Sequence, residues 1–305
     1  MIQQFDSLFD LLKAFPDELS AIKHFEAIRW KRGAYCPHCG SIKIYHFADQ
    51  KTHKCGDCRK RFSIKVGTIF EDSKIGLQKW FMAIWLITSH KKGIASTQLA
   101  KDISVTQKTA WFMLHRLRCA AKTKSFNRPL DGTVEADETF VGGKEKNKHS
   151  HKKLNRGRGA VGKTPVLGVK SRDGEVRFEK VEDLTGTVAK DMIRRNVKVG
   201  ATLLTDEARV YRGLDGEYNH YTVNHSAGEY VRWYFFHTNT IESAWALLKR
   251  QIIGIHHFVS AKHLQRYLDE MMFRQNNRDV EEGNRVNMLL HAASGKRLLY
   301  KDLIA

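Results

Sequence analysis

The sequence predicts a multidomain α+β fold, with a small cysteine-rich module, a helical region and a mixed α/β domain in that order. Three patterns support this prediction: two Cys-x-x-Cys pairs before residue 60, apolar residues at helical spacing over residues 73–128, and alternating strand and helix patterns from residue 129. The 305 residues suffice for two or three domains, and a composition with 42% hydrophobic and 28% charged residues is that of a folded protein.

Residues 1–28 are predicted to form two helices, because apolar residues recur there at helical spacing. Pro16 interrupts this pattern and opens the second helix, whose first turn carries Asp17 and Glu18. Acidic side chains in a first turn interact favourably with the helix dipole. We expect the two helices to cover the cysteine-rich module.

The module over residues 29–72 carries the first chemical motif. Cys36 and Cys39 form one Cys-x-x-Cys pair, Cys55 and Cys58 form the second, and fifteen residues separate the pairs. Each tight turn aims two sulfurs at one ion, and two such turns complete a tetrahedral thiolate site for Zn²⁺. Because strand patterns lie between and after the pairs, we predict a zinc ribbon with a structural ion. Two disulfides are the alternative, and they fit poorly with the absence of an export signal.

Residues 73–128 are predicted to be helical and to contain a helix-turn-helix-like pair. Two short helical patterns are separated by a turn over residues 102–104. These proportions are those of a helix-turn-helix, whose second helix would present Thr106, Gln107 and Lys108 to a DNA groove. A plain helical bundle remains the alternative interpretation.

Residues 129–305 are predicted to form one mixed α/β domain, because Pro129 ends the helical pattern. Two strand-rich hairpin segments are followed by strand–helix units, a pattern that predicts a mixed sheet flanked by helices. A long amphipathic helix begins near Thr238.

The chain is strongly basic, since 52 Lys and Arg residues against 33 Asp and Glu residues give a formal net charge of +19. Such an excess fits a polyanionic partner, because neutralising phosphates releases counterions. Part of the charge gathers in residues 144–163, where Glu145 is the only acidic residue. The basic residues of this loop are Lys144, Lys146, Lys148, Lys152, Lys153, Arg156, Arg158 and Lys163. We predict that the loop binds nucleic acid, with an ordinary solvated loop as the alternative.

No membrane span or export signal is predicted. The longest apolar run, over residues 81–87, is far shorter than the roughly 20 residues that a membrane helix needs. The N-terminus lacks a basic segment followed by an apolar stretch and a cleavage site. We therefore expect a cytoplasmic protein.

Three acidic residues occupy positions that favour catalysis. Asp137 lies in a predicted strand that leads to a Gly-Gly turn, Asp206 ends an apolar strand, and Glu242 lies in the first turn of the long helix. The carboxyl ends of strands are where α/β sheets place their sites. Carboxylates can hold two Mg²⁺ ions about 4 Å apart for phosphodiester cleavage.

Neighbouring residues leave alternatives within this constellation. Asp137 and Asp206 are selected by position over three nearby acids, Glu135, Glu138 and Glu207.

On the long helix, Asn239, Glu242 and Lys249 share one face, so that a metal ligand and a cation for a DNA phosphate would lie together. An ordinary exposed lysine is the alternative for Lys249. His237 is a candidate neighbour of substrate or metal, with a surface histidine as its alternative.

Together these motifs resemble a known family, the transposases of bacterial insertion sequences of the fifteen-ninety-five (ISXO-two-like) family. The resemblance covers nearly the whole chain and rests on the two cysteine pairs, VEADETFVGGK, LLTDEA and HTNTIESAWALLKRQIIGIHHFVSAKHLQRYLDEMMFRQNNR. It implies a ribonuclease-H-like catalytic domain with DDE chemistry, in which Asp137 and Asp206 match the first two family acids. The third family position is Asn or Glu, and both Asn239 and Glu242 stand in the motif. Glu242 fits better, because 35 residues separate it from Asp206 and Lys249 follows seven residues later.

The resemblance also implies the reaction and the partners. Two Mg²⁺ or Mn²⁺ ions held by Asp137, Asp206 and Glu242 would promote cleavage at the element ends, and the freed 3′-hydroxyl would then attack target DNA. The ribbon and the helix-turn-helix would recognise the terminal inverted repeats, and the basic loop would hold end or target DNA. A dimer or larger assembly in the bacterial cytoplasm, associated with the nucleoid, is expected. A metal-dependent nuclease or resolvase without strand transfer and a non-catalytic zinc-ribbon DNA-binding factor are the rival interpretations.

Overall fold

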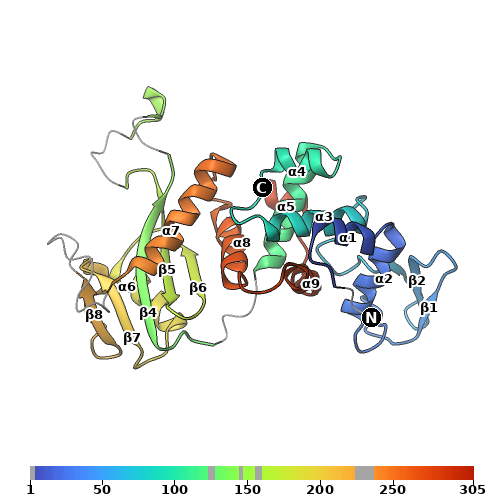
Figure 1. Cartoon of the computed structure of the whole chain (residues 1–305), viewed down its shortest axis with the longest axis horizontal. Coiled ribbons are helices and arrows are strands. Elements are labelled where there is room, and N and C mark those ends of the chain that lie inside the picture. Colours follow the sequence, from blue (N-terminus) through green and yellow to red (C-terminus); the bar gives the residue numbers. More distant parts are fainter. Residues whose placement is uncertain (1–3, 123–127, 144–146, 155–159, 224–236) are drawn as a thin grey trace. The chain divides into compact units, whose positions relative to one another are not determined.

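The computed structural model of this chain describes residues 4–122, 128–143, 147–154, 160–223 and 237–305. The residues fall into two compact units, shown in Figure 1. The first unit combines Met1–Thr123 with Asn277–Ala305, and the second is Lys124–Asn276. No helix in the described ranges is long and apolar enough to cross a membrane.

The first unit begins with the two predicted helices, α1 (Leu8–Ala14) and α2 (Glu18–Arg29), with Pro16 between them. Asp17 caps α2 by accepting a hydrogen bond from the Ser20 backbone N–H at 2.8 Å. Such caps satisfy N–H groups that have no partner within the helix.

The ribbon that follows is a three-stranded antiparallel sheet in the order β1-β2-β3. The strands are β1 (Ile44–His46), β2 (Thr52–Cys55) and β3 (Arg61–Ser63). The predicted hairpin between the cysteine pairs and the third strand after them are therefore confirmed.

Three helices follow the ribbon in the first unit: α3 (Leu77–Ser89), α4 (Ser96–Asp102) and α5 (Gln107–Ala121). The start of α3 is capped by a residue that is distant in the sequence: Glu18 accepts hydrogen bonds from the backbone N–H groups of Leu77 at 2.8 Å and Gln78 at 3.2 Å. Gly76 leaves room for this carboxylate, since a Cβ at that position would meet a Glu18 oxygen at 2.5 Å and the Glu18 side chain would have to shift.

The C-terminal segment completes the first unit and corrects the predicted domain of residues 129–305. Helix α9 (Glu282–Ala292) packs against α2, α3 and α5, as Figure 1 shows, and α10 (Tyr300–Ile304) follows it. The reason is burial of the apolar face of α9, supported by a 2.8 Å hydrogen bond between Asn287 and His24. Residues 277–305 thus belong with the N-terminal unit, and so do the predicted segments 1–28 and 29–72 and the predicted segment 73–128 as far as Thr123.

The second unit is built on a five-stranded mixed sheet in the order β6-β5-β4-β7-β8. Strand β5 is antiparallel to both β4 and β6, whereas β7 runs parallel to β4 and β8 parallel to β7. The strands are β4 (Thr133–Val141), β5 (Thr164–Ser171), β6 (Val176–Lys180), β7 (Thr202–Asp206) and β8 (Asn219–Val223).

Helices cover both faces of this sheet. Helix α6 (Gly186–Asn196) and the short helix η4 (Arg209–Tyr211) pack on the face to which Val134 and Ala136 point. Helices α7 (Asn239–Gln251) and α8 (Leu264–Asn276) share a second hydrophobic core with the opposite face. An antiparallel meander extended by two parallel strands, with helices on both faces, is the ribonuclease-H-like arrangement, which confirms the predicted fold.

Candidate functional site

Asp137 and Asp206 lie on adjacent parallel strands. Strand β4 pairs with β7 so that Glu135 is opposite Leu204, and the same register, extended by two residues, brings Asp137 level with Asp206. Burial raises the pKa of Asp137 to about 7, and the negative charges of Glu138 and Asp206 add to this effect. The fold therefore gathers negative charge at the end of these two strands.

Trp245 of α7 holds one oxygen of Asp137. The indole Nε1 donates a hydrogen bond to Asp137 Oδ2 at 3.0 Å. The ring also stacks on Phe178, with 4.3 Å between the ring centroids. Gly168, the β5 residue opposite Asp137, leaves room for this ring, because a Cβ there would approach Trp245 at 2.5 Å. Trp245 is thus both a core residue and a partner of the candidate catalytic acid.

Glu138 adds a third carboxylate beside these two acids. Tyr211 donates its hydroxyl to Glu138 Oε2 at 2.6 Å, and burial together with the charge of Asp206 raises the pKa of Glu138. Asp206 itself accepts the backbone N–H of Ala208 at 3.0 Å. The contact with Tyr211 was not predicted, because the two partners are 73 positions apart in the sequence.

Glu135 has a structural role that the sequence pattern did not reveal. Its fully buried carboxylate accepts the backbone N–H groups of Thr240 at 3.0 Å and Ile241 at 2.9 Å, at the start of α7. Its other oxygen accepts from Arg172 Nε at 3.1 Å and lies 3.5 Å from His237 Nδ1. Glu135 therefore ties the helix that carries Glu242 to the strand that carries Asp137.

We expect Glu135→Ala to lower the free energy of unfolding by about 3 kcal/mol, because removing one partner leaves Arg172 and two helix N–H groups without their acceptor. Urea unfolding measures this loss. Glu182→Ala is the matched control, since Glu182 forms an exposed ion pair with Lys180, and such a pair contributes about 0–1 kcal/mol. Equal losses for the two variants would contradict the assigned role of Glu135.

The first turn of α7 carries both candidates for the third catalytic position. Asn239 and Glu242 are exposed, and Thr238 Oγ1 donates a hydrogen bond to Glu242 Oε1 at 3.0 Å. Glu242, Trp245 and Lys249 share one flank of the helix, because they are three and four residues apart. Glu242 is therefore one turn away from the residue that binds Asp137.

His237 lies just before α7 and is half-buried. Its ring lies beside Glu135, and its carbonyl oxygen accepts a hydrogen bond from Arg172 at 3.1 Å. The side chain thus packs beside the buried carboxylate at the helix start, and a role as a neighbour of substrate or metal stays a prediction.

The acids suit divalent cations in chemistry, although they do not form a closed cluster. Carboxylate oxygens are the ligands that Mg²⁺ and Mn²⁺ prefer, and a cation would offset the repulsion that raises the pKa of Asp137. Among the described residues, the only group of three or more His, Cys, Asp or Glu side chains whose ligand atoms all lie within 4.8 Å consists of the four ribbon cysteines.

The ribbon cysteines have the geometry of a zinc site. The Sγ atoms of Cys36 and Cys58 are 3.7 Å apart, and those of Cys39 and Cys55 are 3.6 Å apart. A tetrahedron with Zn–S bonds of about 2.3 Å has S···S edges of about 3.8 Å, so the four sulfurs fit one Zn²⁺. Cys119, the fifth cysteine, lies in α5 and outside this group.

The predicted helical pair is formed by α4 and α5. Thr106, Gln107 and Lys108 are exposed at the start of α5, but each already has a contact within the unit. Thr106 caps α5, Gln107 donates to Ser96 Oγ at 3.0 Å, and the Lys108 ammonium lies 5.1 Å from the centroid of the Tyr300 ring. Binding of DNA by these residues stays a prediction.

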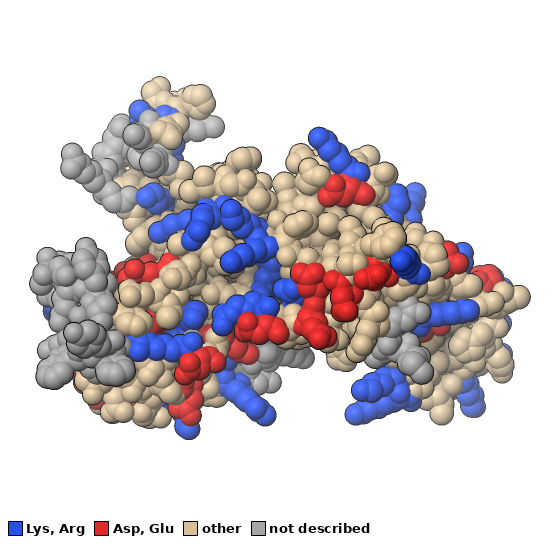
Figure 2. All heavy atoms as spheres, in the orientation of Figure 1, with Lys and Arg blue, Asp and Glu red and all other residues tan. Residues whose placement is uncertain are grey.

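The basic loop is only partly described. Lys144, Lys146, Arg156 and Arg158 lie outside the described residues, as does the side chain of Lys152. Lys153 is exposed, whereas Lys148 and Lys163 are half-buried. Figure 2 shows that Lys and Arg side chains are spread over much of the face in view, so the positive charge is not confined to this loop.

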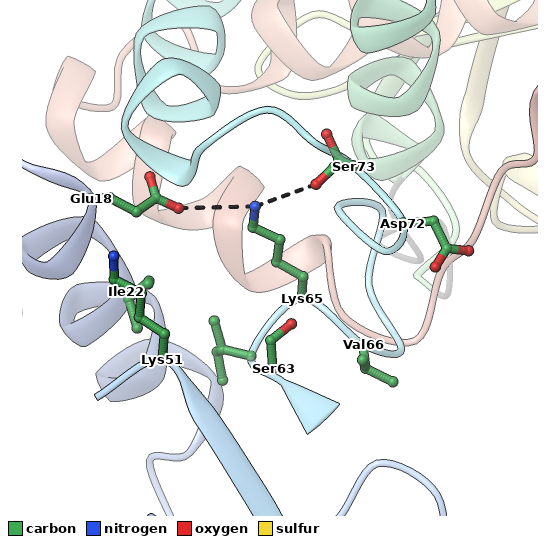
Figure 3. A pocket seen from close by; sticks show the side chains of 9 residues that line it. Glu18, Ile22, Lys51, Ser63, Lys65, Val66, Asp72 and Ser73 are labelled. Atoms are coloured by element: carbon green, nitrogen blue, oxygen red, sulfur yellow. Dashed lines mark hydrogen bonds and ion pairs between the residues drawn. The ribbon is translucent and has the colours of Figure 1, made fainter. Parts of the chain in front are cut away.

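A cavity of about 350 Å³ lies in the first unit, and none of the candidate catalytic acids lines it (Figure 3). Its central cation, Lys65, donates to the carbonyl oxygen of Ile75 at 2.8 Å and lies 3.9 Å from a carboxylate oxygen of Glu18. Burial lowers the pKa of this lysine. The cationic group is already bound within the protein, so we assign the cavity no catalytic role.

Two family models match this chain, one over the zinc ribbon and one over the second unit. A family model described as an ISXO2-like transposase domain matches residues 129–276, which end where the second unit ends, and one described as a transposase zinc-ribbon domain matches residues 16–61. The chain is 31% identical, over 279 residues, to a Halobacterium salinarum protein described as an uncharacterized protein in transposable element ISH50. The match covers 87% of this chain and 92% of that protein.

Two solved structures show weak similarity. The Mos1 strand transfer complex is 14% identical with a TM-score of 0.29, covering 69% of this chain and 74% of that one. A pre-cleavage Mos1 transpososome is 13% identical with a TM-score of 0.25, covering 72% and 80%. Superpositions this poor support no argument about fold or function.

Proposed function

Because the chain belongs to the family of ISXO2-like transposases, we propose that it binds the terminal inverted repeats of an insertion sequence, cleaves DNA at the element ends and joins the freed 3′-hydroxyl to target DNA. The observation that carries this proposal is the placement of Asp137 and Asp206 on adjacent parallel strands, with the flank of α7 that bears Glu242 beside them.

Asp137, Asp206 and Glu242 are the residues that would hold two divalent cations, Mg²⁺ or Mn²⁺. When bound, such ions supply Lewis acidity to the attacking and leaving oxygens of a phosphodiester. Trp245 fixes one Asp137 oxygen and so orients the carboxylate, and Lys249 on the same helix flank would hold a DNA phosphate. Glu135 holds the start of α7 against β4 and thereby positions Glu242 in the first turn of that helix.

Recognition of the element ends is assigned to the first unit. Its zinc ribbon and the pair α4–α5 supply compact surfaces for DNA, with Thr106, Gln107 and Lys108 at the exposed start of α5. The loop over residues 144–163 would contact the backbone of end or target DNA through its basic residues. Two ends must be joined in one complex, so the active form is proposed to be a dimer or a larger assembly.

The identity of the third acid gives the sharpest test of this proposal. We expect Glu242→Gln to reduce cleavage and joining at least a hundredfold, because a neutral amide binds a divalent cation far less well than a carboxylate. Asn239→Ala should retain most of both activities. The measurement uses Mg²⁺ and labelled linear DNA that carries the ends of the protein's own element, with nicking and joining to a plasmid scored separately.

The remaining outcomes identify the rival functions. Nicking by the native protein without any joined product would indicate a nuclease or resolvase. Binding of element ends without cleavage in Mg²⁺ or Mn²⁺ would leave a DNA-binding factor. Loss of activity in Asn239→Ala but not in Glu242→Gln would make the asparagine the third catalytic residue.

A further inference from the structure

The turn that follows α7 exposes two large apolar side chains. Ile253 and Phe258 are each 70% exposed, although both are of residue types that normally pack inside. Residues Ile252–His256 form a π-helical turn, a conformation that is rare and often found at functional sites. We call the segment of residues 253–258 the apolar tip.

The base of the apolar tip is firmly anchored. Ile252 and Val259, on either side of it, are buried in the core that α7 and α8 share with the sheet. The His256 ring packs edge-on against Tyr267, with 4.8 Å between the ring centroids. The two side chains are therefore exposed in an ordered turn that is packed on both sides, and not at a frayed helix end.

The backbone next to Phe258 is strained. His257 has φ of +59° and ψ of −42°, which residues other than glycine seldom adopt. A surrounding structure must impose such a conformation, and residues of this kind concentrate at sites of function. Here it occurs one residue before the exposed phenylalanine.

The charged residues that flank the apolar tip in the sequence are all basic. Between Glu242 and Asp269 the sequence contains no acidic residue, whereas Lys249, Arg250 and Lys262 are basic and exposed. An apolar surface within a positive field suits a partner that combines negative charge with flat apolar groups. Nucleic acid has both, in its phosphates and its bases.

The apolar tip also continues the flank of α7 that carries the candidate catalytic residues. Glu242, Lys249 and Ile253 are seven and four residues apart, which places them on one side of the helix. At a rise of about 1.5 Å per residue, Ile253 is about 16 Å from Glu242 along the axis. This span corresponds to roughly five base steps of duplex, each with a rise of about 3.4 Å.

We propose that the apolar tip inserts Ile253 and Phe258 against unstacked bases of the element end, within a few base steps of the cleaved bond. Apolar side chains wedged between base steps unstack them, and an aromatic ring can then stack on an exposed base. This inference rests on the proposed function and adds to it a distortion of the DNA beside the acids.

The test uses the full-length protein and element-end duplexes in which 2-aminopurine replaces one base at each of the six positions around the cleaved bond. The fluorescence of this base rises when it is unstacked. Without a divalent ion, so that no strand is cut, the native protein should raise the fluorescence several-fold at one or two positions. Phe258→Ala should lose most of this rise and bind roughly tenfold more weakly, because it removes the ring that stacks on an exposed base.

Two further variants make the result specific. Phe258→Trp should keep the fluorescence rise, because it keeps an aromatic ring. Val199→Ala, which removes another exposed apolar side chain of the second unit, should leave both the rise and the affinity unchanged. Thermal unfolding of all variants should match that of the native protein, because the altered side chains are exposed.

The contrary results are distinct. An unchanged fluorescence rise in Phe258→Ala, with normal cleavage by the native protein, would overturn this inference and leave the proposed function intact. A variant that is monomeric where the native protein is dimeric, with an unchanged fluorescence rise, would show that a second copy of the chain covers the tip. Failure of the native protein to bind or cut element ends would instead reject the proposed function.

Discussion

Replacing either Asp137 or Asp206 with asparagine should lower DNA cleavage and joining by at least about a thousandfold, because the change removes several kcal/mol of stabilisation that divalent ions give to the transition state. Both acids lie on adjacent parallel strands, where burial, together with the negative charges of Glu138 and Asp206, raises the pKa of Asp137. Asparagine keeps the shape of the side chain and can still accept the hydrogen bond from Trp245. The loss should therefore arise from metal binding and not from misfolding.

Three measurements separate these causes. Cleavage and joining are followed with labelled element ends, binding of the same DNA by a mobility shift, and folding by thermal unfolding. Asp131→Asn is the matched control, because Asp131 precedes the same strand but is exposed and paired with Lys198. Full activity in Asp137→Asn, or an equal loss in Asp131→Asn, would contradict the placement of the catalytic centre.

Removal of Zn²⁺ should unfold the ribbon and abolish specific binding to the element ends. The four sulfurs belong to turns that are held together by very few apolar residues: buried Cys36, Cys55 and Phe62 form the centre of that cluster. In comparable peptides, zinc binding supplies about 10–16 kcal/mol of apparent free energy, more than so small a cluster can replace. We expect Cys39→Ser to lose stoichiometric Zn²⁺ and at least about tenfold in affinity for the ends.

The metal content of the purified protein and its affinity for end DNA in increasing chelator provide the readouts. Cys119→Ser is the control, since that thiol lies in α5 and outside the cluster. Specific binding that survives complete removal of Zn²⁺ would show that the helical pair reads the ends without the ribbon. If Cys119→Ser also lost the ion, the assignment of the four ligands would be wrong.

The zinc ribbon was predictable from the sequence because its signal is local. A Cys-x-x-Cys pair fixes the spacing of two ligands within one turn, so the motif alone predicts which sulfur atoms lie close together. Asp137 and Asp206 were predictable for a related reason: each occupies a recognisable place on its own strand, and strands of an α/β sheet expose such places at one edge. The parallel register of β4 and β7 agrees with that expectation.

Only the tertiary structure decided the surroundings of the acids. Glu135 looks like a third strand carboxylate in the sequence, yet it caps a helix that begins more than one hundred residues later. Trp245 looks like an ordinary core residue, but its Nε1 reaches Asp137 because glycine at position 168 opens the space. No local sequence pattern predicts these hydrogen bonds, because each depends on how a helix packs on a sheet.

The same limit explains the misplaced domain boundary and the role of Thr106. The sequence by itself predicted the convergence of the four cysteines and the mixed order of strands and helices, because these depend on spacing between near neighbours. The ribonuclease-H-like fold followed from the family resemblance, and the catalytic role of the two strand acids stays a prediction. The structure alone joined residues 277–305 to the N-terminal unit and showed that Thr106 caps α5. The apolar face of α9 is buried against helices that are far away in the chain. Because the hydrophobic effect is not directional, an apolar face in the sequence does not indicate which element will cover it.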